Sequence, residues 1–216
     1  MIKAVIFDLD GVIAKTDNYH YLAWKKTCEE HHLFFDKDLN NELRGVSRQN
    51  SLNIILKHNK SKMNEDSINQ ILSEENQYFN EIISKINEND LFTGIIDVFK
   101  ELKVRNIKIG VGTMTKHSKE IIDGLNIRSY FDAIVDGNMV VNSKPDPEVF
   151  LSCAKLLEVN PTETLVIEDG KSGIEAANAG GFISVAIRNV TSLNIAKFNI
   201  DDITEVLDVL KSVESE

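Results

Sequence analysis

Two aspartates near the start of the chain have the types and spacing that could do chemistry. Asp8 and Asp10 follow the apolar run Ile2–Phe7, and Gly11 comes next. One carboxylate of such a pair can attack phosphorus and form an aspartyl phosphate, while the other gives a proton to the leaving oxygen. Gly11 would let the chain turn tightly, so that backbone amides face a phosphate. Most isolated Asp-x-Asp pairs only solvate a turn, so further residues are needed to support this chemistry.

Three other strand-like segments are also followed by residues that suit phosphoryl transfer. Thr113 closes one apolar run, Lys144 lies in the loop after another, and Glu168-Asp169 follow a third. In an open parallel sheet, ligands bind beyond the carboxyl ends of the strands, so we expect these side chains to lie beside the two aspartates. Thr113 would donate a hydrogen bond to a phosphoryl oxygen, and Lys144 would balance the developing negative charge.

The predicted group of carboxylates also indicates a cofactor. Carboxylates that converge on one point repel each other unless a cation lies among them. Oxygen ligands without histidine or cysteine favour Mg²⁺. The sequence therefore predicts metal-assisted phosphoryl transfer with Mg²⁺ as the cofactor.

The segments that must position these residues alternate between strands and helices. Short, nearly continuous apolar runs are typical of strands buried on both faces of a parallel sheet. Helical patterns separate them, as in 94–105 and 147–158. This alternation predicts an α/β fold with a doubly wound, Rossmann-like parallel sheet as its core. The predicted strands are Ile2–Phe7, Ile107–Thr113, Ala133–Val135, Thr164–Ile167 and Phe182–Ile187.

The segment after the first strand has a different composition and shows only helical periodicity. It is dense in Asn, Lys, Glu and His, and helices are expected at Tyr19–His31, 47–58 and 66–84. We therefore predict a helical cap domain at 15–92, inserted into a catalytic core domain formed by 1–14 and 93–216. The two connections between these domains would lie close together and form a hinge.

Composition limits the possible partners. The chain has 216 residues and a formal net charge of −10, which argues against nucleic acid or an acidic membrane surface as a partner. No apolar run is long enough to span a bilayer, and the N-terminus does not read as a signal peptide. Cys28 and Cys153 are expected to be reduced and structural. We expect a cytoplasmic monomer.

The order and spacing of these residues resemble a known family over essentially the whole chain. The chain is similar to the haloacid dehalogenase superfamily, whose four motifs match Asp8-Leu9-Asp10-Gly11-Val12, Thr113, Lys144 and Glu168-Asp169. Within that superfamily it is most similar to the β-phosphoglucomutases. The segments that carry this second resemblance are Asp17-Asn18-Tyr19-His20 with Trp24, Gly45-Val46-Ser47-Arg48 with Ser51, Ser143-Lys144-Pro145 and Ile167-Glu168-Asp169.

The resemblance implies a reaction and a role for the catalytic residues. The reaction would interconvert β-D-glucose 1-phosphate and glucose 6-phosphate through a 1,6-bisphosphate. Asp8 would be the nucleophile and Asp10 the general acid and base, while Thr113 and Lys144 would bind the transferring phosphate. The implied Mg²⁺ ligands are Asp8, the backbone carbonyl of Asp10, Glu168 and Asp169.

The resemblance also implies a substrate site in the cap. Arg48 would hold the distal phosphate, and His20 would help to hold the closed state. The implied substrate-binding residues are His20, Trp24, Gly45, Val46, Ser47, Arg48, Ser51, Thr115 and Lys116.

Three departures from the family pattern leave the substrate open. Gly170 stands where relatives usually have serine, Met114 is bulky, and Glu74-Glu75 occupy a helix where a basic residue would help to hold the distal phosphate. A Mg²⁺-dependent phosphatase of small sugar phosphates is therefore the alternative to the mutase. A signalling receiver domain also has an Asp, a Thr and a Lys at such an edge, but it has no use for a helical lid.

Overall fold

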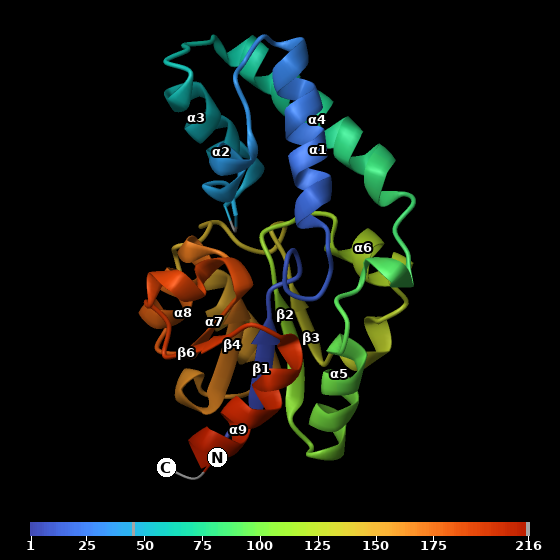
Figure 1. Ribbon diagram of the computed structural model, residues 1–216, viewed down its shortest axis with the longest axis vertical. Coiled ribbons are helices and arrows are strands. Elements are labelled where there is room, and N and C mark those ends of the chain that lie inside the picture. Colours follow the sequence, from blue (N-terminus) through green and yellow to red (C-terminus); the bar gives the residue numbers. More distant parts are fainter. Residues whose placement is uncertain (45, 215–216) are drawn as a thin grey trace.

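The core of the protein is a six-stranded parallel sheet with the order β3-β2-β1-β4-β5-β6 (Figure 1). The structure is a computed structural model that describes residues 1–44 and 46–214. The chain adds strands on one side of β1 and then on the other, so the order reverses between β1 and β4. The strands are β1 (Ala4–Phe7), β2 (Lys108–Gly112), β3 (Ala133–Val135), β4 (Thr164–Glu168), β5 (Ile183–Ile187) and β6 (Phe198–Ile200).

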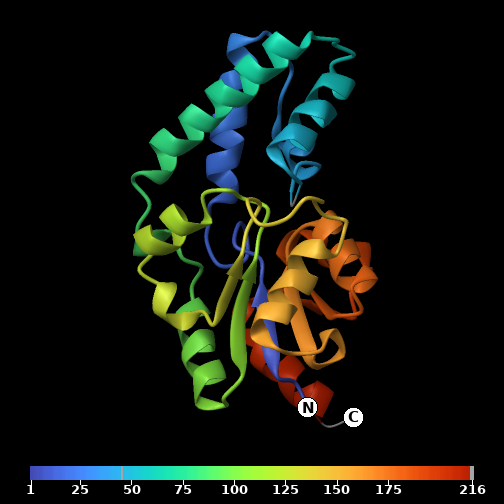
Figure 2. The same ribbon diagram turned by 180° about the vertical axis from the view of Figure 1, so that it is seen from behind.

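Helices cover both faces of this sheet, and the strands are apolar on both faces for that reason. Val5 and Phe7 belong to one buried cluster, whereas Ala4 and Ile6 belong to the cluster on the opposite face. The first cluster is closed by α5 (Ile95–Val104), α6 (Ser118–Gly124) and α9 (Val206–Glu214). The second is closed by α7 (Glu148–Leu157) and α8 (Lys171–Ala179), seen from behind in Figure 2.

A helical insert follows β1 and lies over the carboxyl ends of the strands (Figure 1). Trp24, Leu52 and Ile55 lie in its separate apolar core, and α1 packs along α4. Its helices are α1 (Asp17–Glu30), α2 (Lys37–Asn41), α3 (Arg48–His58) and α4 (Glu65–Ile83).

The buried face of α4 contains one charged residue. The buried positions of this helix are Ile71, Glu75, Phe79 and Ile83, which recur at four-residue steps. Such a stripe is the face that a helix turns toward its neighbours. Glu75 therefore stands in line with buried apolar residues, although it carries a carboxylate.

The chain enters and leaves the insert at neighbouring points. Ala14 forms an isolated antiparallel bridge with Leu91, and the amide of Phe92 donates to the carbonyl of Ile13 at 3.1 Å. Two connections held together in this way can act as a hinge. The division at 14/15 and 92/93 remains a prediction.

The predicted α/β class and the helical insert are confirmed, and all five predicted strands are present. The sixth strand β6 was not predicted, and neither were α2, α6 and α8. Five short 3₁₀ segments complete the described elements, at Glu88–Asp90, Arg128–Tyr130, Pro161–Glu163, Arg188–Leu193 and Ile203–Glu205. Within residues 1–44 and 46–214, no helix has the length and apolar character needed to cross a bilayer. Both cysteines are free and buried.

Candidate active site

Strand register brings the first acidic residue into line with two neighbouring strands. Phe7 pairs with Val111 of β2 and with Ile167 of β4. The residues that follow Phe7, Val111 and Ile167 lie at the same level of the sheet. Asp8 therefore lies between Gly112 and Glu168. This position is beside the reversal of strand order, where ligands bind in open α/β sheets.

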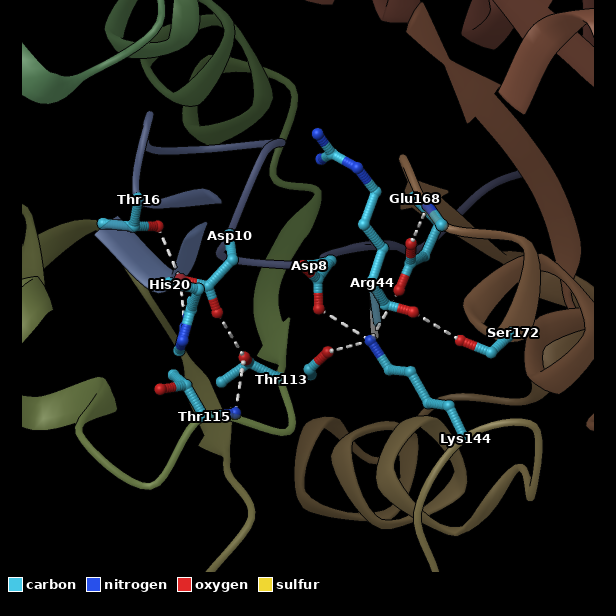
Figure 3. Close-up of polar contacts among 12 residues, drawn as sticks. Asp8, Asp10, Thr16, His20, Arg44, Thr113, Thr115, Lys144, Glu168 and Ser172 are labelled. Carbon is cyan, nitrogen blue, oxygen red and sulfur yellow. Dashed lines mark hydrogen bonds and ion pairs between the residues drawn. The ribbon is translucent and has the colours of Figure 1, made fainter. Parts of the chain in front are cut away.

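A buried lysine joins the acids at this edge. The Nζ of Lys144 donates to Asp8 Oδ1 and to Glu168 Oε1, both at 2.6 Å, and to the carbonyl of Gly112 at 3.2 Å (Figure 3). The Lys144 side chain is completely buried. One ammonium group therefore holds the ends of β1, β2 and β4 together.

The charges of this group shift the pKa values of its members. Burial alone would lower the pKa of Lys144, but the carboxylates of Asp8 and Glu168 outweigh it and raise that pKa above the ordinary lysine value. Burial raises the pKa of Asp8 well above its usual range, and Lys144 only partly opposes this because Glu168 and Asp10 raise it further. Lys144 is thus held charged, and its single charge does not neutralise the acids around it.

Asp10 has different neighbours. Its Oδ1 accepts a hydrogen bond from Thr16 and lies 3.7 Å from His20 Nε2, while Thr113 Oγ1 lies 3.5 Å from Oδ2. Burial alone would raise the pKa of Asp10, but His20 and Thr16 outweigh it and hold that pKa below its usual value. Asp10 is therefore kept in the ionised form, which is the form of a general base.

The acidic residues at this edge fit a divalent cation. One carboxylate oxygen each from Asp8, Glu168 and Asp169 lie within 4.8 Å of one another, and all three residues are buried. Lys144 contacts Asp8 and Glu168, and Arg44 contacts Asp169, so carboxylates outnumber these two cations at the site. An all-oxygen donor set of this kind suits Mg²⁺.

Two glycines allow the acids to approach the backbone so closely. Gly11 has φ of +80°, and a Cβ there would lie 2.2 Å from Asp169 Oδ2. A Cβ at Gly173 would lie 1.9 Å from Glu168 Oε1. Side chains at either position would push a candidate metal ligand aside, so these glycines are part of the site.

The helical insert contacts this acidic edge through Arg44. The guanidinium of Arg44 pairs with Asp169, and its carbonyl accepts from Ser172 Oγ at 2.9 Å (Figure 3). A Cβ at Gly170 would lie 3.3 Å from the Arg44 carbonyl oxygen, which is tight. Gly170, which stands where relatives usually have serine, therefore leaves room for Arg44 to approach.

Two further hydrogen bonds join the insert to the core. Asn50 Nδ2 donates to Ser143 Oγ at 2.8 Å, and His117 Nε2 lies 2.8 Å from Asn76 Oδ1. These contacts come from α3 and α4 and reach loops at the carboxyl edge of the sheet. The insert is thus closed over the sheet edge.

A cavity of about 790 Å³ lies between the insert and the sheet edge. On the sheet side it is lined by Asp8, Asp10 and Asp169, together with Thr113, Thr115 and Lys116. Lys144 and Glu168 were also predicted, and they lie next to Asp8: Lys144 bonds to both acids. Gly45 lies outside the described residues. The predicted residues that line the cavity from the insert are His20, Trp24, Val46, Ser47, Arg48 and Ser51.

Several residues of this site were not predicted from the sequence. The contact of Arg44 with an acid of the sheet edge was not expected. Thr16, Asn76 and His117 were not considered. Glu75 was noted only as an unexpected acid, whereas it is buried and pairs with Arg48. The one available signal was its place on the apolar stripe of α4.

The fold and the site together define a class of protein. A parallel sheet with a helical insert after its first strand, and buried acids with a lysine at the strand ends, are typical of enzymes that form an aspartyl intermediate. A family model described as haloacid dehalogenase-like hydrolase matches residues 5–187, and the chain belongs to this family.

Similar proteins include both mutases and phosphatases. A β-phosphoglucomutase of Bacillus subtilis (strain 168) is 39% identical over 188 residues, which is 86% of this chain and 83% of that protein. A phosphorylated carbohydrates phosphatase of Thermotoga maritima is 32% identical over 222 residues, covering 98% of this chain and 100% of that protein. A crystal structure of β-phosphoglucomutase from Clostridium difficile superposes with a TM-score of 0.91 at 36% identity, covering 98% and 96% of the two chains.

Proposed function

We propose that this chain is a Mg²⁺-dependent phosphomutase that converts β-D-glucose 1-phosphate to glucose 6-phosphate through a 1,6-bisphosphate and a phosphorylated Asp8. The observation that carries the proposal is a single cavity with Asp8 and Asp10 on one side and Arg48 on the other. A sugar with phosphate at either end needs a reacting group on one side and a cation on the other. Two relatives named β-phosphoglucomutase, at 39% and 36% identity, support this reading.

The chemistry begins at Asp8. Its carboxylate attacks the phosphorus of the sugar bisphosphate, the bond from phosphorus to the sugar oxygen breaks, and an acyl phosphate forms. Lys144, bonded to Asp8 at 2.6 Å, offsets the negative charge that gathers on the phosphoryl oxygens. Thr113 and Thr115 offer hydroxyls at the same side of the cavity. The Oγ1 of Thr115 is buried with no hydrogen-bond partner among the described residues, which suits a donor to phosphate.

Proton transfer belongs to Asp10. Asp10 first removes a proton from the sugar hydroxyl that attacks phosphorylated Asp8, and it then gives that proton to the sugar oxygen that leaves when Asp8 attacks the other phosphate of the bisphosphate. His20 and Thr16 hold its carboxylate in place, and His20 is itself stacked on Phe79 with 4.1 Å between ring centroids. The insert therefore positions the acid and base of the reaction.

The cofactor would be held by the acidic edge. Asp8, Glu168, Asp169 and the backbone carbonyl of Asp10 are the proposed Mg²⁺ ligands. When bound, the ion supplies charge stabilisation to the transferring phosphoryl group.

Hydrolysis of small sugar phosphates is the second candidate function. It needs the same Asp8 and Asp10 but admits water to the phosphoenzyme. The observation in its favour is the pairing of Arg48 with Glu75, because this acid reduces the positive charge available to a second phosphate. The relative named as a phosphatase, at 32% identity, supports it too.

A product assay separates the two candidates. The protein is incubated with β-D-glucose 1-phosphate, Mg²⁺ and a trace of the 1,6-bisphosphate. We expect glucose 6-phosphate to form without a matching amount of inorganic phosphate. Inorganic phosphate as the main product would overturn the mutase in favour of the phosphatase. A cytoplasmic monomer remains part of this proposal, and gel filtration with light scattering tests its oligomeric state.

A further inference from the structure

Glu75 combines three properties that ordinary surface acids lack. Its side chain is fully buried, it lies on the apolar stripe of α4, and it lines the cavity. A carboxylate is seldom kept in such a place unless each oxygen has a partner. The partners of its two carboxylate oxygens therefore indicate the role of Glu75.

Only one of the two oxygens has a partner in the described part of the chain. Oε2 accepts from Nε of Arg48, whereas Oε1 is buried and accepts no hydrogen bond from any described residue. A buried acceptor left without a donor is costly, so such an atom beside a cavity indicates a donor on the ligand. A sugar hydroxyl is a donor of the right kind.

The contact with Glu75 also changes how Arg48 can bind an anion. Arg48 carries one positive charge on a planar group with five donors. The bond to Glu75 occupies Nε and sets a negative charge directly beside the guanidinium. Their paired charge is close to neutral, and a phosphate that approaches Arg48 also approaches the carboxylate. Repulsion of that kind in a confined cavity opposes anion binding strongly.

We propose that Glu75 is a specificity-determining residue that accepts a sugar hydroxyl and weakens the grip of Arg48 on a second phosphate. The insert side then holds the sugar partly through a hydroxyl group, and it holds a second phosphate less tightly than Arg48 alone would. This deepens the proposed function and rests on it, because a bisphosphate held less tightly can turn around in the cavity between the two half-reactions.

The test measures binding without turnover. In an Asp8→Asn background with Mg²⁺ present, calorimetry gives the dissociation constants of β-D-glucose 1-phosphate and of the 1,6-bisphosphate. We expect Glu75→Gln, which keeps the shape and an acceptor oxygen, to tighten bisphosphate binding about tenfold or more. The monophosphate constant should change by less than about threefold. Glu75→Ala, which removes the acceptor as well, should also weaken monophosphate binding by about threefold or more.

A matched control is the neighbouring residue in the same helix. Glu74 pairs with His31, so Glu74→Gln makes the same change in net charge without touching Arg48. It should leave both constants unchanged. The charge argument would be overturned if Glu74→Gln and Glu75→Gln tightened bisphosphate binding equally, or if Glu75→Gln did not tighten it. A monophosphate that binds Glu75→Ala as tightly as the parent would overturn the hydroxyl contact.

Failure of the proposed function gives a different pattern. The product assay on the unmodified protein reports whether the chain is a mutase, and it does not depend on Glu75. The binding series is run in parallel with fructose 1-phosphate and fructose 1,6-bisphosphate. If Glu75→Gln tightens neither bisphosphate, the proposal for Glu75 is wrong whatever the product assay gives.

Discussion

The two sides of the cavity are built in different ways. On the sheet side, Asp8 and Glu168 lie at the carboxyl ends of the paired strands β1 and β4, and both accept from the ammonium of Lys144 at 2.6 Å. On the insert side, Arg48 and Glu75 come from two helices and pair with each other. The sheet side is fixed by backbone register and suits chemistry, which tolerates little displacement. The insert side depends on side-chain choices, and it can change the substrate without altering the reaction.

The largest expected effect tests the sheet side. Asp8→Asn removes the carboxylate that we propose as the nucleophile but keeps the size of the side chain. We expect the loss of both mutase and hydrolase activity, on the order of 10⁴-fold or more, because the proposed covalent intermediate forms on Asp8. The assay measures glucose 6-phosphate and inorganic phosphate together. An Asp8→Asn protein with more than about a hundredth of the parent activity would refute the nucleophile assignment.

Asp10→Asn distinguishes proton transfer from simple positioning. The rate with sugar phosphates should fall by about 10²–10⁴-fold, because an alkoxide leaving group needs a proton. The rate with an activated aryl phosphate should fall much less, since its leaving group departs without one. The ratio of the two rates is the measurement. Equal losses with both substrates would argue against a general acid.

Lys144→Met tests the buried charge that holds the strand ends together. Without metal, the substitution leaves Asp8 and Glu168 buried with no cation, and we expect a loss of about 3–5 kcal/mol in the free energy of unfolding. Lys103→Met is the control, because its partner Asp132 is partly exposed; its cost should stay within about 1 kcal/mol. Urea unfolding of both variants gives the comparison. Similar losses of unfolding free energy in Lys144→Met and Lys103→Met would contradict a special role for Lys144.

Arg44→Ala tests the link between the two sides. Its guanidinium contacts Asp169, so it competes with a divalent ion for a proposed ligand. We expect the dissociation constant for Mn²⁺, followed by electron paramagnetic resonance, to fall by about threefold to tenfold. Ser172→Ala removes a bond to the Arg44 carbonyl but no charge, and it should leave the constant nearly unchanged. Weaker Mn²⁺ binding in Arg44→Ala would show that the arginine supports the ion instead.

The smallest effect concerns His117, which lies between the two sides. Burial of the ring, with a smaller contribution from Arg48, lowers the pKa of His117 below its usual value of 6.5. The unfolded chain then binds a proton more readily, so this residue's contribution to stability is complete above pH 6.5 and is lost as the pH falls below it. His117→Asn should make the free energy of unfolding depend less on pH between about 6.5 and 5. An unchanged dependence would contradict this account.

The sheet side could be predicted from the sequence because its signals are local. Continuous apolar runs such as Thr164–Ile167 marked the strands, and parallel strands end at one edge, so the residues after them had to meet. The strand β6 was missed because Phe198–Ile200 is three residues long with a polar centre and lies at the edge of the sheet. The helix α2 has only five residues and no apolar repeat.

The insert side could be predicted only in part. Helical periodicity identified α1, α3 and α4, but a helix does not show in its sequence which residues of another helix it will meet. The pairing of Arg48 with Glu75 spans 27 positions, and that of Arg44 with Asp169 spans 125. The first depends on how α3 packs against α4, and the second on how the insert closes on the sheet.

The central claim is that Asp8 carries the phosphoryl group, and trapping that group tests it most directly. The protein is treated with Mg²⁺ and acetyl phosphate, quenched in acid, digested and analysed by mass spectrometry. We predict one phosphoryl group per chain, on the peptide containing Asp8, removed by hydroxylamine and absent from Asp8→Asn. A phosphoryl group on any other residue, or a fully active protein that never carries one, would contradict the account.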